Sequence, residues 1–137
     1  MRKADLSSLL IDLTIDTKRS LLLFLTRDGT INRQGTGELD RFDTRLFAGV
    51  VGPDMFSRLV AQFPEEWLMH PGAFSLPGTG LKCKLGIEFS DKRSKVEFSF
   101  EYFSEGEGPP RDICEFVMKA LDLTDSWYEA QKGSTHG

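Results

Sequence analysis

The chain has 137 residues, of which 39% are hydrophobic and 28% charged, and its net charge is −4. This is the usual size of one domain, so we expect a single domain over residues 1–132. Two cysteines are too few for the disulfide framework of a small secreted protein, and the longest apolar run, at 21–25, is far shorter than the roughly 20 residues that span a bilayer. The sequence has no basic stripe of the kind that indicates nucleic-acid binding. We therefore expect a cytoplasmic protein that binds neither membranes nor nucleic acids.

Residues 9–16 begin the predicted structure with an alternating pattern, LIDLTID after Leu9, that is typical of a half-buried strand. A helix whose apolar face includes Leu6, Leu9, Leu10 and Leu13 fits nearly as well, so both remain open. The run LLLFL at 21–25 is apolar at every position. That pattern predicts a central strand covered on both faces.

The stretch LLFLTRDGTI at 22–31 resembles the loop of the haloacid-dehalogenase-like phosphatases, in which an apolar strand ends in D-x-D-G-T. The resemblance implies a first aspartate that attacks phosphorus, but Thr26 stands at that position here. A threonine has no carboxylate to form the acyl phosphate. Asp28-Gly29 between two strands is instead a strong signal for a type I′ hairpin turn, whose two central residues need positive φ. We therefore predict a turn and no catalytic loop.

A long connection from Gly35 to Gly52 precedes the first predicted helix. Pro53 suits the first helical position and Asp54 suits the positive N-terminal end of a helix. Apolar residues then recur at i, i+3, i+4 and i+7 as far as Phe63, and Pro64 ends the pattern. Residues 67–78, rich in proline and glycine, are predicted to form a loop.

The clearest predicted element is a hairpin from Leu81 to Phe103. Every second residue of both halves is apolar, and a polar turn at residues 91–94 separates them. One face of the hairpin should therefore be buried and the other wet. Lysines and glutamates on the wet face are placed to pair across the strands.

Two further helices follow a predicted loop at residues 105–110. The first carries an apolar stripe from Ile113 to Leu121, and a separate short helix runs from about Asp125 to Gln131. Residues 133–137 are predicted to be a flexible tail.

Together these elements predict an α+β fold, with an antiparallel sheet of about five strands. Two main helices and the short C-terminal helix accompany the sheet, because each main helix has one apolar stripe that must be covered. Gly52-Pro53 before the first helix is echoed by Gly108-Pro109 before the second. A ββα-ββα arrangement is therefore an alternative that the sequence leaves open.

Two predicted loops, 35–52 and 67–72, concentrate arginine and aromatic residues. Loops held by a rigid scaffold carry function disproportionately. No nucleotide-binding motif, metal ligand set or catalytic constellation is complete, so no catalytic residue, cofactor or metal is predicted. The candidate ligand-binding residues, which lie in or beside these loops, are Arg33, Arg41, Arg45, Trp67 and His70.

Acidic residues concentrate in the last third of the chain. Residues 1–96 carry 14 Lys/Arg and 12 Asp/Glu, whereas residues 97–129 carry two Lys/Arg and nine Asp/Glu. An acidic surface can steer a basic partner through its field, although the outer faces of soluble helices also need charge. The candidate partner-binding residues are Glu105, Glu107, Asp112 and Glu115.

The sequence leaves two classes of function open. The favoured one is a non-enzymatic protein-interaction domain, of adaptor or immunity/inhibitor type, that presents an acidic surface to a basic protein partner. The alternative is a small-molecule-binding protein or an enzyme that uses the 35–52 loop with the 67–72 segment. The oligomeric state is not specified by the sequence.

Overall fold

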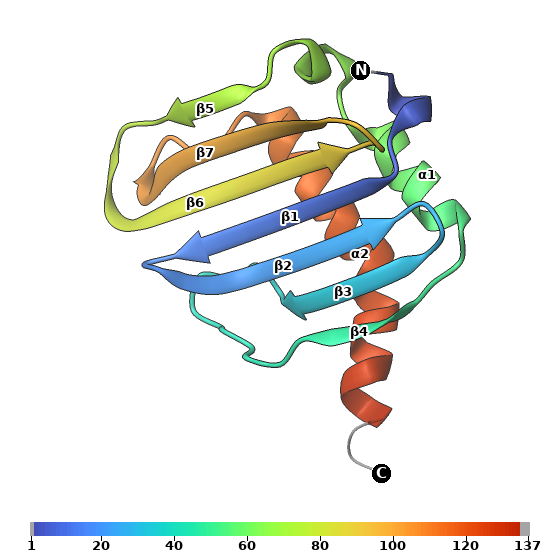
Figure 1. The fold of residues 1–137 in the computed structure, drawn as a ribbon. Coiled ribbons are helices and arrows are strands. Elements are labelled where there is room, and N and C mark those ends of the chain that lie inside the picture. Colours follow the sequence, from blue (N-terminus) through green and yellow to red (C-terminus); the bar gives the residue numbers. More distant parts are fainter. Residues whose placement is uncertain (1, 135–137) are drawn as a thin grey trace.

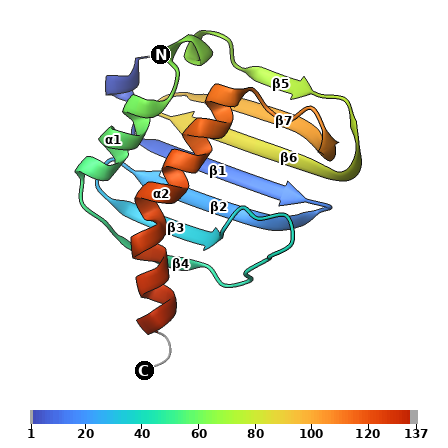
Figure 2. The same cartoon turned by 180° about the vertical axis from the view of Figure 1, so that it is seen from behind.

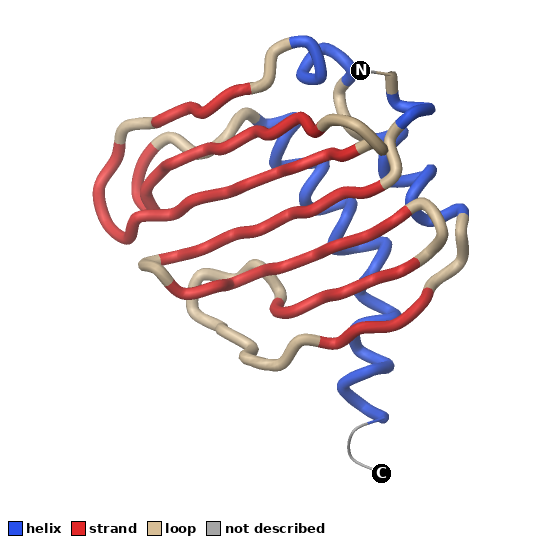
Figure 3. Tube along the Cα trace, viewed as in Figure 1, coloured by secondary structure: helices blue, strands red, loops and turns tan. Residues whose placement is uncertain are grey.

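A seven-stranded mixed sheet and two α-helices make up the fold, in a computed structural model that describes residues 2–134 (Figures 1 and 3). The strand order is β4-β3-β2-β1-β6-β7-β5, and all neighbours are antiparallel except β5 and β7. The α+β class is thus confirmed, with seven strands where about five were expected. In chain order the elements are η1 (Lys3–Asp5), β1 (Ser8–Ile15), β2 (Lys18–Thr26), β3 (Thr30–Gly35), β4 (Phe47–Val50), α1 (Asp54–Gln62), η2 (Glu65–Met69), β5 (Gly72–Ser75), β6 (Gly78–Ser90), β7 (Lys95–Gly106) and α2 (Arg111–Ser134).

Both α-helices lie on one face of the sheet and leave the other face open (Figure 2). Helix α2 crosses the strands from β7 to β4, and its last turns extend past β4. The expectation that residues 21–25 are covered on both faces is therefore wrong. Leu21 and Leu23 are fully buried beneath the helices, whereas Leu22 and Phe24 lie half-buried on the open face.

The core forms between the sheet and the two helices. Residues 8–15 are a strand, which resolves the strand-or-helix ambiguity, and every second side chain of β1 is buried. Phe63, at the end of α1, joins both sides of the core. Its ring centroid lies 4.8 Å from that of Phe89 in β6 and 4.9 Å from that of Phe116 in α2, both in edge-to-face geometry.

The Asp28-Gly29 segment is a hairpin turn between β2 and β3, as predicted, but its type differs. Only Gly29 has positive φ, and the Gly29 N–H donates to the Thr26 carbonyl at 3.1 Å. The hydrogen bond from the Thr26 hydroxyl lowers the pKa of Asp28 most. The hydrogen bonds from the Thr30 N–H and hydroxyl lower this pKa further. The Asp28 carboxylate therefore stabilises the turn. The two consecutive positive φ values expected of a type I′ turn occur instead at Asp16 and Thr17, between β1 and β2.

The C-terminal part is one 24-residue helix, not two helices. The helix continues through the residues between the two predicted helices, where the Thr124 hydroxyl donates to the Ala120 carbonyl at 2.8 Å. Of the predicted tail, Gly133 and Ser134 are the last residues of α2, and residues 135–137 lie outside the described part.

The ββα-ββα alternative does not match the topology. Four strands precede α1, and three lie between α1 and α2. Strands β4 and β5 fall in segments that were predicted to be loops, and they form the two edges of the sheet.

Candidate functional site

The two predicted ligand loops lie far apart. The 35–52 segment contains edge strand β4, whereas the 67–72 segment leads into edge strand β5, so the two occupy opposite edges of the sheet (Figure 1). The structure does not bring them together into one cavity.

Arg33 is a structural residue beneath α2. Its side chain is 1% exposed, and Nη1 lies 2.7 Å from Asp125 Oδ1 and donates to Thr124 Oγ1 at 2.9 Å. The guanidinium carbon lies 4.4 Å from the ring centroid of Tyr128. These contacts join β3 to α2 and hold the guanidinium within the fold.

Tyr128 completes this attachment of α2. Its hydroxyl accepts a hydrogen bond from the Gly35 N–H at 2.8 Å and donates to Asp43 Oδ2 at 2.9 Å. Burial raises the pKa of Tyr128, so the phenol stays protonated and keeps both bonds at neutral pH.

Trp67 is also held by structural contacts. Its Nε1 donates to Asp112 Oδ2 at 2.9 Å, and its ring meets that of Phe100 edge-to-face at 5.8 Å. Asp112 Oδ1 accepts from the Ile113 N–H, so both oxygens of this predicted partner-binding residue are engaged. His70 is exposed at the end of η2.

Arg41 and Arg45 lie in the loop before β4. Arg41 pairs with Asp43 at 3.4 Å, and this carboxylate raises the pKa of Arg41. The guanidinium of Arg45 lies over the ring of Phe47 at 5.1 Å. Both are partly tied to near neighbours in the sequence.

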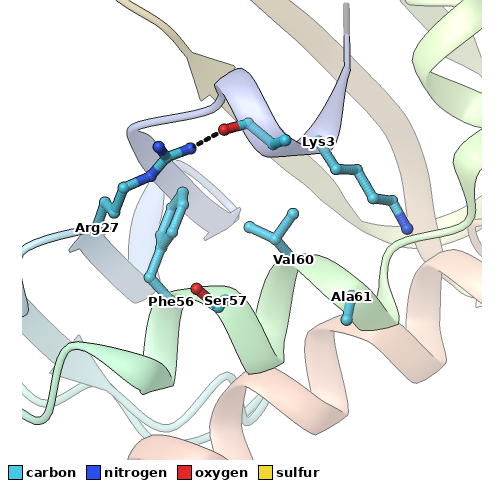
Figure 4. Close-up of a pocket in the computed structure, with 7 residues that line it drawn as sticks. Lys3, Arg27, Phe56, Ser57, Val60 and Ala61 are labelled. Atoms are coloured by element: carbon cyan, nitrogen blue, oxygen red, sulfur yellow. Dashed lines mark hydrogen bonds between the residues drawn. The ribbon is translucent and has the colours of Figure 1, made fainter.

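A cavity of about 400 Å³ lies between η1 and α1 (Figure 4). Its two cations donate to backbone carbonyls: Lys3 to that of Phe63, and Arg27 to those of Ala4 and Leu6. They fasten the N-terminal segment to the core. Apart from Ser57, the remaining lining residues are apolar or backbone, which gives no acid–base pair and no activated nucleophile.

The outer face of α2 combines charge, an exposed apolar side chain and concavity. We define the acidic face of α2 as Glu115, Met118, Asp122, Asp125 and Glu129. Their spacing of three and four residues places them along one side of the helix. Met118 is 62% exposed, one turn after Glu115 and one turn before Asp122.

Two hollows flank this face. The α1-side hollow, about 380 Å³, lies between α2 and the end of α1 and includes Gln62, Pro64 and Glu115. The loop-side hollow, about 330 Å³, lies between α2 and the 36–41 loop and includes Glu38 and Glu129. Met118 and Asp122 line both hollows.

Three of the four carboxylates have cationic neighbours. Glu115 pairs with Arg111 at 3.0 Å and Glu129 with Lys132 at 3.0 Å, both exposed or partly exposed pairs, while Asp125 pairs with buried Arg33. Among the described residues, Asp122 has no ion-pair partner. Exposed pairs contribute little and exchange readily with water, so Glu115 and Glu129, together with Asp122, stay accessible to a cation from outside.

Of the predicted partner-binding residues, only Glu115 belongs to the acidic face. Glu105 is the last residue but one of β7 and Glu107 follows the strand, both exposed. Sequence reasoning missed Asp122, Asp125 and Glu129. The signal was the three-and-four spacing that continues from Glu115, and dividing α2 into two helices hid it.

Within the described part of the chain, no helix is long and apolar enough to cross a membrane, and no group of three or more His, Cys, Asp and Glu side chains is placed to hold a metal ion. Comparison with known proteins also gave no relative: no protein-family model matches the chain, and no curated protein matches it.

Proposed function

We propose that the protein is a small protein-interaction domain, an adaptor or inhibitor, whose acidic face of α2 binds a basic segment of another protein. The observation that carries the proposal is Met118, 62% exposed between Glu115 and Asp122 on a face of α2 that continues through Asp125 and Glu129. An apolar centre with a charged rim is the usual anatomy of a protein interface, in which methionine is enriched.

The two kinds of residue would contribute differently. Exposed carboxylates raise the association rate for a cationic partner and select against acidic ones, and salt weakens both effects. Their pairs add little affinity, so desolvation of Met118 would supply the stable part of the contact. Relative to the sequence-based expectation, the proposed centre moves from residues 105–115 to residues 115–129.

The test compares two variants that each remove three negative charges. Glu115→Gln/Asp122→Asn/Glu129→Gln changes the acidic face, and Glu88→Gln/Glu97→Gln/Glu101→Gln changes the open face of the sheet. The wild type and both variants would serve as tagged bait in extracts of the native cells, at low and moderate salt, with mass spectrometry of what is retained.

We expect a basic protein to bind the wild type and the open-face variant at low salt and to dissociate as salt rises. It should be lost from the acidic-face variant. Equal retention of every bound protein by the two variants would contradict the proposal. A role for the 35–52 and 67–72 segments as one ligand site is not proposed, because they lie at opposite edges of the sheet.

A further inference from the structure

The two hollows beside the acidic face are offset along α2. The α1-side hollow follows α2 from Asp112 to Asp122, and the loop-side hollow follows it from Met118 to Glu129. They lie on opposite sides of the helix and meet at the turn that carries Met118 and Asp122. A path from one hollow to the other therefore crosses α2 diagonally over Met118.

We infer that the partner contributes an extended segment that crosses α2 at Met118, with an apolar side chain on Met118 and one lysine or arginine in each hollow. The inference rests on the proposed function and specifies the ligand of the same site. It assigns the partner a short pattern: basic, any, apolar, any, basic.

The spacing follows from strand geometry. In an extended chain residues i, i+2 and i+4 face the same side, and i and i+4 lie about 13 Å apart. An α-helix with its side chains is about 10–12 Å across, so two such residues reach both sides of α2. In a helical partner, residues i and i+4 lie only about 6 Å apart along the axis, too close to reach both hollows.

Charge in the hollows favours a cation on each side. Six described carboxylates line them, against the cations Lys119, Arg33 and Arg41. Arg33 and Asp125 pair with each other, Asp43 holds Arg41, and both oxygens of Asp112 are engaged. Four carboxylates therefore remain against Lys119. An incoming cation would meet Glu115 and Asp122 on the α1 side, and Glu38 and Glu129 on the loop side.

The experiment uses two synthetic peptides of identical composition, blocked at both ends and flanked by glycine. One contains Lys-Ser-Leu-Ser-Lys, which places both lysines and the leucine on one side of an extended chain. The other contains Lys-Leu-Ser-Ser-Lys, which turns the leucine to the opposite side. Each is titrated into the isotopically labelled full chain at low salt, and affinity and perturbed residues are read by NMR.

We expect the first peptide to bind roughly fivefold more tightly, because only its leucine can cover Met118. Its resonance changes should include residues of both hollows. Met118→Ser should abolish the difference between the peptides while leaving the salt-dependent binding of the second one. Glu38→Gln, on the loop side, should weaken binding of the first peptide. It should leave the stability of the protein unchanged, because the Glu38 side chain is exposed.

The outcomes separate this inference from the proposed function. Equal binding of both peptides to the acidic face, or changes confined to one hollow, overturns the crossing segment and leaves the proposed function standing. Binding of neither peptide, together with equal partner retention by the acidic-face and open-face variants, overturns both.

Discussion

The β1–β2 hairpin turns through Asp16 and Thr17, in a backbone conformation that threonine rarely adopts. Their φ angles are 50° and 67°. Two consecutive positive φ values belong to a type I′ turn, whose usual sequence is Asn-Gly. A β-branched residue such as Thr17 is strained in the left-handed region, by about 1–2 kcal/mol.

Replacing Asp16-Thr17 by Asn-Gly should therefore raise the free energy of unfolding by about 1 kcal/mol. Urea denaturation measures the change. Thr14→Gly, in the neighbouring strand, is the control and should lower stability, since glycine weakens a strand interior. A less stable Asp16→Asn/Thr17→Gly variant would mean that the native side chains contribute more than the strain costs.

A second residue gives the fold a dependence on alkaline pH. Burial raises the pKa of Tyr102 to about 12, with smaller contributions from Cys83 and Cys114. The folded protein thus holds the phenolic proton more tightly than the unfolded chain, whose value is 10.0. The stability that this group contributes is complete below pH 10 and is lost as the pH rises toward 12.

Tyr102→Phe should make this loss shallower. The wild type should lose up to about 1.4 kcal/mol per pH unit from Tyr102 between pH 10 and pH 12, and the variant should lack that part. Denaturation at several pH values from 9 upward gives both slopes. Tyr128, whose pKa is also raised, is present in both proteins. Parallel curves would show that Tyr102 is not protected by the fold.

Arg33 shows what sequence could have revealed at the level of one residue. It was predicted to be a candidate ligand residue beside a loop, but it alternates with Ile31 and Gly35, all on the buried face of β3. Strand periodicity alone would have placed it inside. The sequence could not show that its partner is Asp125, some 90 residues later. This carboxylate compensates the buried charge of Arg33 only when the chain is folded.

At the level of elements, α2 acts as one unit because it is attached at both of its halves. Asp112 meets Trp67 near its start, and Asp125 and Tyr128 meet β3 near its end. An interruption between these attachments should be costly even where the side chain is exposed.

Ser126→Pro tests this continuity. Proline removes one helical hydrogen bond and clashes with the preceding turn, which costs about 3 kcal/mol or more in a helix interior. Ser126 is exposed, so Ser126→Ala is a matched control and should leave stability nearly unchanged or slightly higher. Urea denaturation of both variants gives the difference. A proline variant within 1 kcal/mol of the wild type would mean that the last turns of α2 contribute little.

Elements with a long, strict period were predictable. The alternation in β6 and β7 and the stripe of α1 extend over enough residues to be seen without tertiary information. Strands β4 and β5 have four residues each, and their pairing with the sheet forms them. Gly49 in β4 looks like a loop residue, but a Cβ there would lie 2.8 Å from Trp127 Cζ2 of α2.

At the level of the whole molecule, a local pattern could not decide which sheet face is covered. LLLFL at 21–25 is apolar on both faces, but the two α-helices both pack on one side (Figure 2). Leu10, Leu22 and Phe24 consequently lie together, half-buried, on the open face, where Leu10 is paired with Phe24. The position of the acidic face depended on the same global fact, since it is the side of α2 that faces away from the sheet.

The central place of β1 has a consequence for how the chain is made. β1 pairs on one side with β2, which follows immediately, and on the other with residues 83–90 of β6. At about 5–20 residues per second, a ribosome needs on the order of ten seconds to add β6 after β1. During that time one edge of the innermost strand has no native neighbour, and unpaired edges invite association with other chains. Until β6 has been made, β1, the strand at the centre of the finished sheet, therefore has an edge that is open to association with other chains.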